Sequence, residues 1–335
     1  MSAGRRIGTA LLAALGAAVL AAAFAGVWFQ QAAYGDRSLP ASETTLIVPR
    51  GATGSEVAKL LGERRVIGSP FAFTLLARLR HEEGAMKAGE FRFPAHQSAG
   101  EVLGQVVSSG SQVAVWVTIP EGYTAREIAH ELAARSLGTE DGFIAYFMGH
   151  SLALPGSRTR TLEGVLFPST YLIPTGAAPA EIAKIFTDEF LRNLPADAQR
   201  KAQRLGYSVA QIVTLASLIE REAKADDERP LMAGVYYNRL RIGMPLEVDA
   251  TIEYTFAHHK DVITLADLAR DSPYNTYKQA GLPPTPIANP GRPSLLAAFA
   301  PEPSQYLFYV YKGDGHHAFS RTLAEHNANV ARYLH

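Results

Sequence analysis

A repeated spacing of proline and glutamate constrains the fold of this chain more than any other feature. Four stretches place a Pro seven positions before a Glu, and extended apolar runs (TLIV, FRF, VWVTI and YLI) precede the prolines. Apolar residues at helical spacing follow every Glu. This order predicts a strand, a turn and a helix in each copy. The four pairs are Pro49 and Glu56, Pro94 and Glu101, Pro120 and Glu127, and Pro174 and Glu181.

The glutamates of this repeat occupy the positions of helix-capping residues. In three copies a Ser or Thr lies three residues before the Glu, as in the S/T-x-x-E capping box. The hydroxyl then accepts from the backbone N–H of the Glu, and the carboxylate accepts from the N–H of the cap residue. We therefore expect these glutamates to be structural rather than catalytic. The three predicted boxes are Thr53 with Glu56, Ser98 with Glu101, and Thr124 with Glu127.

An uncharged apolar stretch from Ile7 to Phe29 lies near the start of the chain. A helix of that length rises roughly 35 Å, compared with about 30 Å for the hydrocarbon core of a bilayer. Arg5 and Arg6 precede it and predict a cytoplasmic N-terminus, while Trp28 suits the opposite interface. A cleaved signal peptide is the alternative, but its apolar run is usually shorter. The stretch predicts a transmembrane anchor, followed by a linker over residues 30–43.

Composition excludes several classes of function. The chain has 335 residues, and its 32 basic residues balance 32 acidic ones. This neutrality argues against a nucleic-acid partner, which usually binds to a basic patch. The chain has no cysteine, so thiol nucleophiles, disulfides and thiolate metal sites are excluded. His316 and His317 adjoin Asp314 but lack a metal-ligand spacing, so we expect neither a metal site nor another cofactor.

Glu222 occupies the apolar face of a predicted helix that begins after Ser208, whose capping box includes Gln211. At about 100° per residue, Glu222 falls inside the apolar stripe and Glu220 falls outside it. Burial would keep the Glu222 carboxyl protonated to higher pH, as a general acid requires. The residues of the stripe are Ile212, Leu215, Leu218 and Ile219.

A buried ion pair is the alternative reading of Glu222. In that case the carboxylate would bind a guanidinium or a backbone amide, and it would have no part in catalysis. The candidate guanidinium partners are Arg221, Arg229, Arg239 and Arg241.

Two segments downstream offer substrate contacts. The sequence LEVDATIEYT, from Leu246 to Thr255, alternates like a strand or extended lip, and its Asp249 either orients a ligand or caps a turn. The Pro- and Gly-rich segment from Asp271 to Gly291 predicts an ordered loop that is either functional or simply packed on the surface. Its aromatic rings can stack on sugars and its polar groups can bind them. The candidate substrate-binding residues are Asp249, Tyr274, Asn275, Thr276 and Tyr277.

The segment 44–110 resembles a LysM-like module on the residues GSEVAKLLGERRVI. Such a module is a small strand–helix–helix–strand fold that grips N-acetylated glycans. The alternative is an α+β packing domain without a ligand. We therefore expect an α+β chain with a cytoplasmic tail over 1–6, a transmembrane helix over 7–29, a LysM-like module over 44–110 and a mixed α/β catalytic domain over 111–335.

The chain, from the apolar N-terminal stretch to near its end, resembles the endolytic murein transglycosylase (MltG or YceG-like) family. The motifs that carry the resemblance are LASLIEREA, NRLRIGM, SPYNTY, GLPP and YLFYVYKGDG. The family's catalytic Glu is the second one of an E-K-E-[TA] pattern, which places it on Glu222, with Arg221 where Lys is common. Glu220, Glu228, Asn238 and Arg239 match family positions and are expected to support the site.

This resemblance implies a single-pass inner-membrane enzyme with a periplasmic catalytic domain. Its substrate would be nascent peptidoglycan strands, cut at the MurNAc–GlcNAc β-1,4 bond to leave 1,6-anhydroMurNAc ends. Glu222 would act first as acid and then as base, and peptidoglycan synthases are possible partners. The alternatives are a hydrolytic muramidase and a non-catalytic glycan-binding scaffold of the wall-synthesis machinery.

Overall fold

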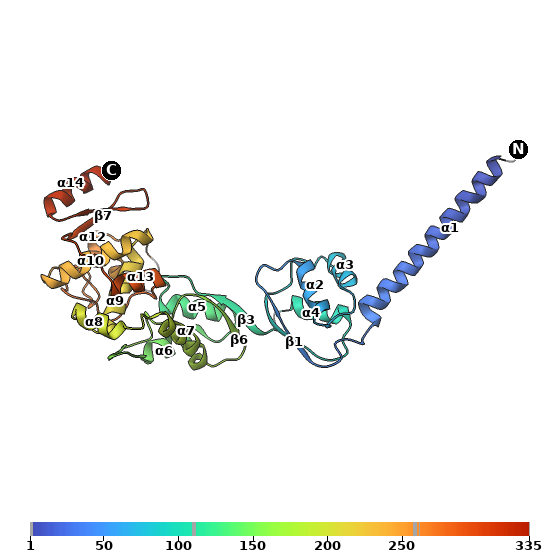
Figure 1. Ribbon diagram of the computed structural model, residues 1–335, viewed down its shortest axis with the longest axis horizontal. Coiled ribbons are helices and arrows are strands. Elements are labelled where there is room, and N and C mark those ends of the chain that lie inside the picture. The colour runs from blue at the N-terminus through green and yellow to red at the C-terminus, as the bar shows by residue number, and fades with distance from the viewer. Residues whose placement is uncertain (1–2, 109–111, 257–259, 261, 335) are drawn as a thin grey trace. The chain divides into compact units, whose positions relative to one another are not determined.

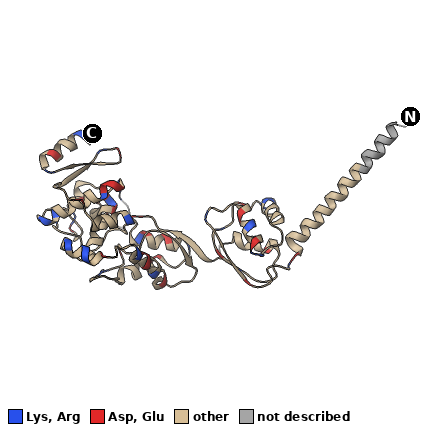
Figure 2. Ribbon diagram, in the orientation of Figure 1, with Lys and Arg blue, Asp and Glu red and all other residues tan. Residues whose placement is uncertain are grey.

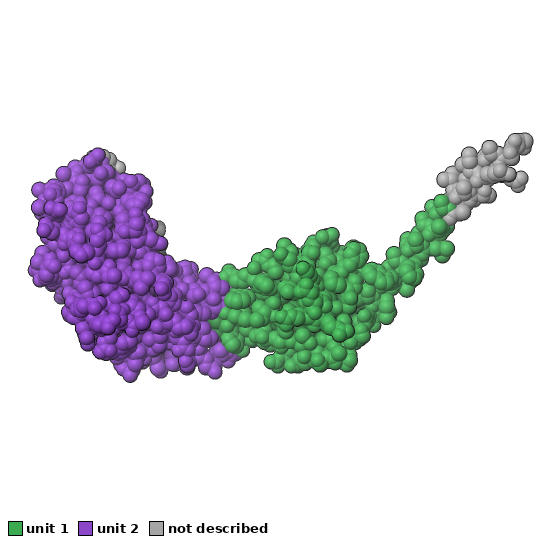
Figure 3. Space-filling view, viewed as in Figure 1, with its two compact units in different colours: residues 1–116, 172–175 green, residues 117–171, 176–335 purple. Residues whose placement is uncertain are grey.

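The computed structural model describes residues 3–108, 112–256, 260 and 262–334. It has a mixed α+β fold with an apolar N-terminal helix (Figure 1). The chain divides into two compact units (Figure 3). Unit 1 consists of residues 1–116 and 172–175, and unit 2 consists of residues 117–171 and 176–335.

The chain begins with helix α1 (Ala3–Gln30), which continues into the π-helical turn η1 (Gln31–Gly35). Its segment Ala14–Gly35 is long and apolar enough to cross a membrane. In Figure 2 this part of α1 is tan, because it contains no Lys, Arg, Asp or Glu. The end of the helix packs against the rest of unit 1, where the centroid of the Trp28 ring lies 6.2 Å from that of Phe71.

All four predicted strands form, and they belong to one sheet in the order β1-β2-β3-β6. Strands β1 and β2 pair antiparallel, with Leu46 opposite Phe91. Each strand is followed by the predicted helix. The strands are β1 (Thr44–Val48), β2 (Gly89–Phe93), β3 (Gln112–Thr118) and β6 (Thr170–Pro174), and the helices are α2 (Gly54–Glu63), α4 (Ala99–Val107), α5 (Ala125–Ala134) and α7 (Pro179–Asn193).

The repeat glutamates cap these helices, as predicted. In the first three copies the complete capping box forms. In the fourth, Ala178 has no hydroxyl, but its backbone N–H still donates to Glu181 at 2.8 Å. In the other copies the cap N–H donates to Glu56 at 2.7 Å, to Glu101 at 2.8 Å and to Glu127 at 2.7 Å.

Replacing Thr53 by Ala is expected to lower the free energy of unfolding of unit 1 by about 1 kcal/mol, because one N-terminal N–H of α2 loses its acceptor. Both tryptophans, Trp28 and Trp116, lie in unit 1, so tryptophan fluorescence during urea unfolding reports on it. Lys59→Ala, on the exposed face of α2, is the control and should change the value by less than about 0.5 kcal/mol. Equal values for the two variants would contradict the capping role.

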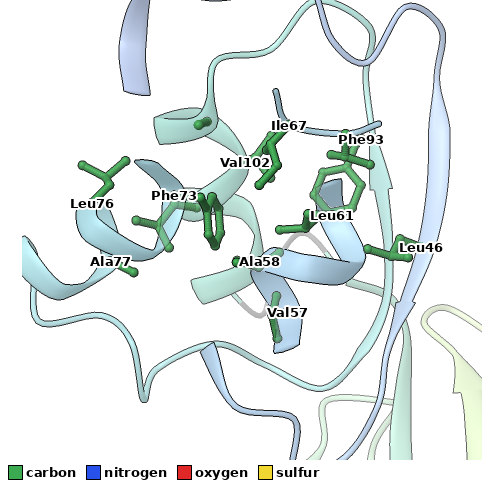
Figure 4. Packing of buried hydrophobic residues seen from close by; sticks show 14 of the residues in the cluster. Leu46, Val57, Ala58, Leu61, Ile67, Phe73, Leu76, Ala77, Phe93 and Val102 are labelled. Carbon is green, nitrogen blue, oxygen red and sulfur yellow. The ribbon is translucent and has the colours of Figure 1, made fainter. Parts of the chain in front are cut away.

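The core of unit 1 forms where α2, α3 (Pro70–Leu79) and α4 pack against β1 and β2. Phe73, Phe91 and Phe93 are fully buried there. Burying a large apolar side chain contributes about 1.5–3 kcal/mol, so the core stabilises the unit chiefly through the apolar faces of the repeat. Figure 4 shows Leu46, Val57, Ala58, Leu61, Ile67, Phe73, Leu76, Ala77, Phe93 and Val102 in this cluster.

Helix α9 (Val209–Glu222) lies at the centre of unit 2, with α10 (Arg229–Arg241) and α13 (Arg292–Phe299) packed against it. The remaining helices of the unit are α6 (Glu140–Gly149), α8 (Ala198–Leu205), η3 (Asp226–Glu228), α11 (Asp249–Glu253), α12 (Leu265–Leu268) and α14 (Leu323–Tyr333). Its short hairpins pair β4 (Ala153–Leu154) with β5 (Ser157–Arg158), and β7 (Phe308–Tyr311) with β8 (His317–Ser320).

The prediction that helix α9 is amphipathic is wrong. Residues 212–219 are all buried, and the side chain of Glu220 is only 6% exposed, although we placed it outside the apolar stripe. Helix α13 covers this second face. A helix enclosed on several sides has no solvent face on which a stripe could be defined. The helix ends at Glu222.

The expected strand over Leu246 to Thr255 is also wrong, because α11 begins at Asp249. Ala250, Thr251 and Ile252 are buried in succession, which a strand with one solvent face would not allow. The guanidinium of Arg239 binds the carbonyls of Pro245 and Leu246. Side chains therefore occupy backbone groups that a neighbouring strand would have needed.

Candidate active site

Glu222 is the last residue of α9, where the chain leaves the helix through an extended Ala223. The Tyr309 hydroxyl, on β7, donates to Oε2 of Glu222 at 3.1 Å. A second hydroxyl, of the fully buried Tyr236 on α10, lies 2.9 Å from that of Tyr309. Helix α9 thus ends with a partly buried carboxyl that is held by a pair of linked phenols.

The environment of Glu222 raises the pKa of its carboxyl. Burial is the largest cause, and the nearby charge of Asp249 raises the pKa further. The Tyr309 hydrogen bond, the charge of Lys224 and the backbone N–H of Ala250 lower the pKa, but they do not cancel the rise. Burial also raises the pKa of Tyr309, so its hydroxyl stays a neutral donor. The Glu222 carboxyl therefore keeps its proton to higher pH than an exposed one.

None of the four candidate arginines forms an ion pair with Glu222 among the described residues. Glu222 is thus free of the guanidinium partner that would hold it ionised. Arg221 pairs with Glu253 at 2.9 Å, Arg229 pairs with Asp226 at 2.8 Å, Arg239 pairs with Glu247 at 2.9 Å, and Arg241 donates to Asn238 at 3.0 Å.

Asp249 and Tyr277 are brought together near the acid. The Tyr277 hydroxyl donates to Oδ1 of Asp249 at 2.6 Å. Asp249 begins α11, whose next residue, Ala250, directs its N–H at Glu222. The predicted loop over residues 271–291, which contains Tyr277, thereby reaches the carboxylate next to Glu222.

Two other candidate residues of this loop, Asn275 and Thr276, are buried. Asn275 is 0% exposed and Thr276 is 1% exposed. The Asn275 amide donates to the carbonyls of Leu268 and Arg270, and the Thr276 hydroxyl accepts from the Val248 N–H. The polar groups of Asn275 and Thr276 therefore hold the loop and the entry to α11 in place.

The side chain of Tyr274 also makes contacts within the protein. Its hydroxyl lies 2.8 Å from that of Thr285, and its ring packs against Tyr254 with centroids 5.0 Å apart. Both contacts lie within unit 2, and the first one joins the two ends of the loop.

The four expected supporting residues fix the segments around the site. Glu220 accepts from the Gly291 N–H at 3.0 Å, at the start of α13, and Glu228 accepts from the His317 N–H at 2.7 Å. Asn238 donates to the carbonyls of Ser304 and Tyr306, and Arg239 donates to that of Leu307. The last two residues therefore bind the strand segment that carries Tyr309.

Sequence reasoning missed two residues of the site, Tyr236 and Tyr309, and one buried carboxyl elsewhere in unit 2, Glu163. The tyrosines lie in the motifs GVYYNRL and YLFYVYKGDG, but no spacing links them to Glu222, which lies 87 residues from Tyr309. Glu163 is 1% exposed and accepts from the Ala125 N–H at 2.9 Å. Its segment EGVLFPSTY contains no helical or strand period that would have indicated burial.

Comparisons with known proteins point to one family. The model of the YceG-like family matches residues 46–332. A protein of Bacillus subtilis named endolytic murein transglycosylase is 31% identical over 316 residues, which cover 88% of this chain and 86% of that protein. A protein of the same name from Streptococcus pneumoniae strain D39 is 28% identical, with 87% of this chain and 58% of that protein covered.

A solved structure agrees with this result. The crystal structure of a yceG-like protein from Listeria monocytogenes matches with a TM-score of 0.62 at 30% identity. The match covers 86% of this chain and 98% of the Listeria chain.

Proposed function

Because the chain belongs to the YceG-like family, we propose that it is a membrane-anchored endolytic lytic transglycosylase of peptidoglycan. It would cleave the β-1,4 bond between MurNAc and GlcNAc within nascent strands and leave 1,6-anhydroMurNAc ends. Such cuts end the elongation of a strand. The names of the curated relatives support the reaction, and the surroundings of Glu222 support the site.

One observation carries this proposal: Glu222 is a carboxyl with a raised pKa, and its side-chain partner is a phenol and not a guanidinium. A structural carboxylate inside a protein is usually stabilised by a cation or by several N–H donors. A general acid needs the opposite, a neutral form that persists near neutral pH. The surroundings of Glu222 meet that requirement.

The reaction follows from a single carboxyl that acts twice. Protonated Glu222 gives its proton to the glycosidic oxygen as the bond from that oxygen to C1 of MurNAc breaks. The acetamido oxygen of the same sugar stabilises the positive charge at C1. Ionised Glu222 then takes the proton of the 6-hydroxyl as that oxygen bonds to C1, which restores the acid. Attack within one sugar has a large orientation advantage, so no second catalytic carboxylate is required.

Tyr309 holds one carboxylate oxygen, Oε2, during both steps, which leaves Oε1 to exchange the proton with the sugar. We assign Asp249 and Tyr277 to substrate positioning at this end of α9, because they are linked to each other and Asp249 acts on Glu222 electrostatically. Asn275, Thr276 and Tyr274 contribute by holding the loop, since their polar groups are bound within the protein.

The membrane anchor and the N-terminal module would determine where in the cell the reaction takes place. Helix α1 would cross the inner membrane once, with the N-terminus in the cytoplasm and residues 30–335 in the periplasm. The order β1, α2, α3, β2 supports a LysM-like module over 44–110. A cavity of about 400 Å³ beside the turn from Pro49 to Ala52 offers it a place for a sugar. The catalytic domain would occupy 111–335, and peptidoglycan synthases are the partners expected at the membrane.

Mass spectrometry of the products tests this function. Full-length protein in mild detergent is incubated with uncrosslinked glycan strands, and the new ends are identified. Ends of the 1,6-anhydro type, arising inside the strands, are the expected result. Release of single disaccharides from strand ends alone would contradict the endolytic part of the proposal.

A hydrolytic muramidase is the second candidate, because Asp249 places another carboxylate close enough to raise the pKa of Glu222. Glycosidases that hydrolyse their substrate usually have two carboxyl groups, one of which activates a water. Such an enzyme would leave reducing ends that are heavier by one water. The same mass spectra therefore distinguish the two reactions.

Replacing Tyr309 by Phe is expected to lower kcat/KM about tenfold, because a hydrogen bond to a charged group contributes roughly 1.5 kcal/mol. It should also move the alkaline limb of the pH profile to higher pH. The Tyr309 hydroxyl lowers the pKa of Glu222, so its loss lets the acid stay protonated at higher pH. Tyr311→Phe is the control, since that hydroxyl accepts from the Gly315 N–H instead. An unmoved limb in the Tyr309 variant would show that the contact has no role in the reaction.

A further inference from the structure

A cavity of about 550 Å³ lies at the opposite end of α9 from Glu222. Ser208, Gln211 and Thr214 line one side of it, at the start of the helix. A helix of 14 residues is about 20 Å long, so this cavity is separate from the acid. The cavity and the acid nevertheless belong to the same compact unit and are connected by one helix.

The lining of this cavity is positively charged. Among the described residues that line it are Arg158 and Arg160 but no Asp or Glu. Both arginines are exposed, whereas Thr159 between them is buried and its hydroxyl accepts from the Leu152 N–H at 2.8 Å. Arg158 donates to the Ser151 hydroxyl, and neither arginine has a carboxylate partner in the part of the chain that the structure describes. Two guanidinium groups are thus available on a fixed backbone.

The opposite wall is rigid and apolar. It is formed by Pro283 and Pro284 of the motif GLPP, followed by Thr285 and Pro286. Gly164 has φ +85°, and a Cβ there would lie 2.4 Å from the Pro286 ring, so the two segments are in close contact.

The same loop extends from this cavity to the acid. Beyond the proline wall, the Ile287 N–H donates to the Ser217 hydroxyl in the middle of α9. Before that wall, Tyr277 of the loop binds Asp249 beside Glu222.

We infer that this cavity binds the peptide that peptidoglycan carries on its muramic acid residues, with Arg158 and Arg160 pairing with the peptide carboxylates. The inference rests on the proposed function. In a strand that carries its peptides, the lactyl carboxyl of each MurNAc is bound in the amide bond to the peptide, so the free carboxylates of the strand are on the peptides. Guanidinium groups bind carboxylates in two-pronged hydrogen bonds, and the proline wall suits the aliphatic parts of the peptide. A strand whose sugar bond lies at Glu222 would then be held by a peptide further along it.

Kinetics with two substrates test this site. One substrate is uncrosslinked strands with their peptides, and the other is the same strands after an amidase has removed the peptides. For the full-length Arg158→Gln/Arg160→Gln variant, KM for peptide-bearing strands is expected to rise about tenfold with kcat unchanged, as expected for the loss of charge-assisted hydrogen bonds. The stripped strands keep a carboxylate only on the lactyl group of each sugar, where it cannot take the place of the carboxylates along the peptide, so their KM should not change.

The matched control is Arg192→Gln/Arg204→Gln, which removes the same charge from unit 2 at exposed positions outside the cavity. An equal rise of KM in the control, or an equal rise for both substrates, would overturn the inference. Binding of the amidase-released peptide, measured by calorimetry, gives a second readout. The affinity for the peptide should fall about tenfold in the cavity variant. Competition by equimolar inorganic phosphate would contradict a peptide site.

The two proposals fail in different ways. If wild-type protein cut neither substrate, the proposed function would fall, and the calorimetric comparison would still decide the peptide site. If wild-type protein cut both substrates with the same KM, only the peptide site would fall.

Discussion

The Glu222→Gln variant is expected to lose about a thousandfold in kcat/KM on peptidoglycan strands, because general acid–base catalysis contributes roughly 10²–10⁴ to an enzymatic rate. Glutamine has the size of glutamate but has no proton to give at neutral pH. Its amide can still accept the hydrogen bond of Tyr309, so the geometry around β7 should persist. Release of anhydro-ended fragments, followed by chromatography, measures the loss.

Two controls separate catalysis from folding. Glu140→Gln changes an exposed glutamate on α6 of the same unit and should leave the rate unchanged. The Glu222 variant should also bind uncleaved strands with the wild-type affinity. A Glu222→Gln protein that cuts at more than about a tenth of the wild-type rate would exclude this residue as the general acid.

The second large effect concerns stability and involves Glu163, a buried carboxyl away from Glu222. Burial raises the pKa of Glu163 from 4.5 to about 7, although several hydrogen-bond donors are directed at it. They include the Ala125 N–H at 2.9 Å, the Asn289 amide at 3.0 Å and the Tyr254 hydroxyl at 3.1 Å. The residue thus joins the start of α5 to α11 and to the end of the 271–291 loop.

Glu163 should make unit 2 less stable as the pH rises. Its pKa is higher in the folded state than in the unfolded state, so the stabilisation is complete below about pH 4.5 and is lost as the pH rises to about 7. Between these values the folded protein retains a proton that the unfolded chain has released. A shift of this size corresponds to about 3 kcal/mol, with the wild type less stable at pH 8 than at pH 4.5 by that contribution.

Glu163→Gln should remove this contribution, because its neutral amide can accept from Ala125 and donate to the Tyr254 oxygen. Urea unfolding followed by tyrosine circular dichroism, at pH 4.5 and pH 8, provides the measurement. The difference between the two pH values should be about 3 kcal/mol smaller in this variant than in Glu302→Gln, an exposed control. Parallel pH profiles for both variants would show that Glu163 does not titrate in this range.

Local patterns predicted the repeat well. The Pro-to-Glu spacing located four strands, four helices and their caps, because a capping box depends on residues only three apart. The start of α9 at Ser208 was predicted for the same reason, and its capping box with Gln211 forms. The choice of Glu222 as the candidate acid followed from family likeness, whereas the helical spacing that separated it from Glu220 does not hold, because both residues lie on covered faces of the helix.

Contacts between distant segments were not predictable in this way. The Tyr309 partner of Glu222, the Glu253 partner of Arg221 and the burial of Glu220 under α13 all join residues far apart in the chain. Alternation over Leu246 to Thr255 suggested a strand, but Arg239 and Thr276 hold its backbone differently. No periodicity within a short window contains this information.

The amino-acid sequence by itself determined the apolar N-terminal helix, the capped strand–helix repeat and the identity of the candidate acid. These depend on side chains within a few residues of one another, where the spacing along the backbone sets the geometry. Only the tertiary structure decided which groups surround that acid, because the free energy of its proton depends on burial, on the charge of Asp249 in α11 and on the hydrogen bond from Tyr309 in β7. Packing brings those elements together, and packing is a property of the whole unit.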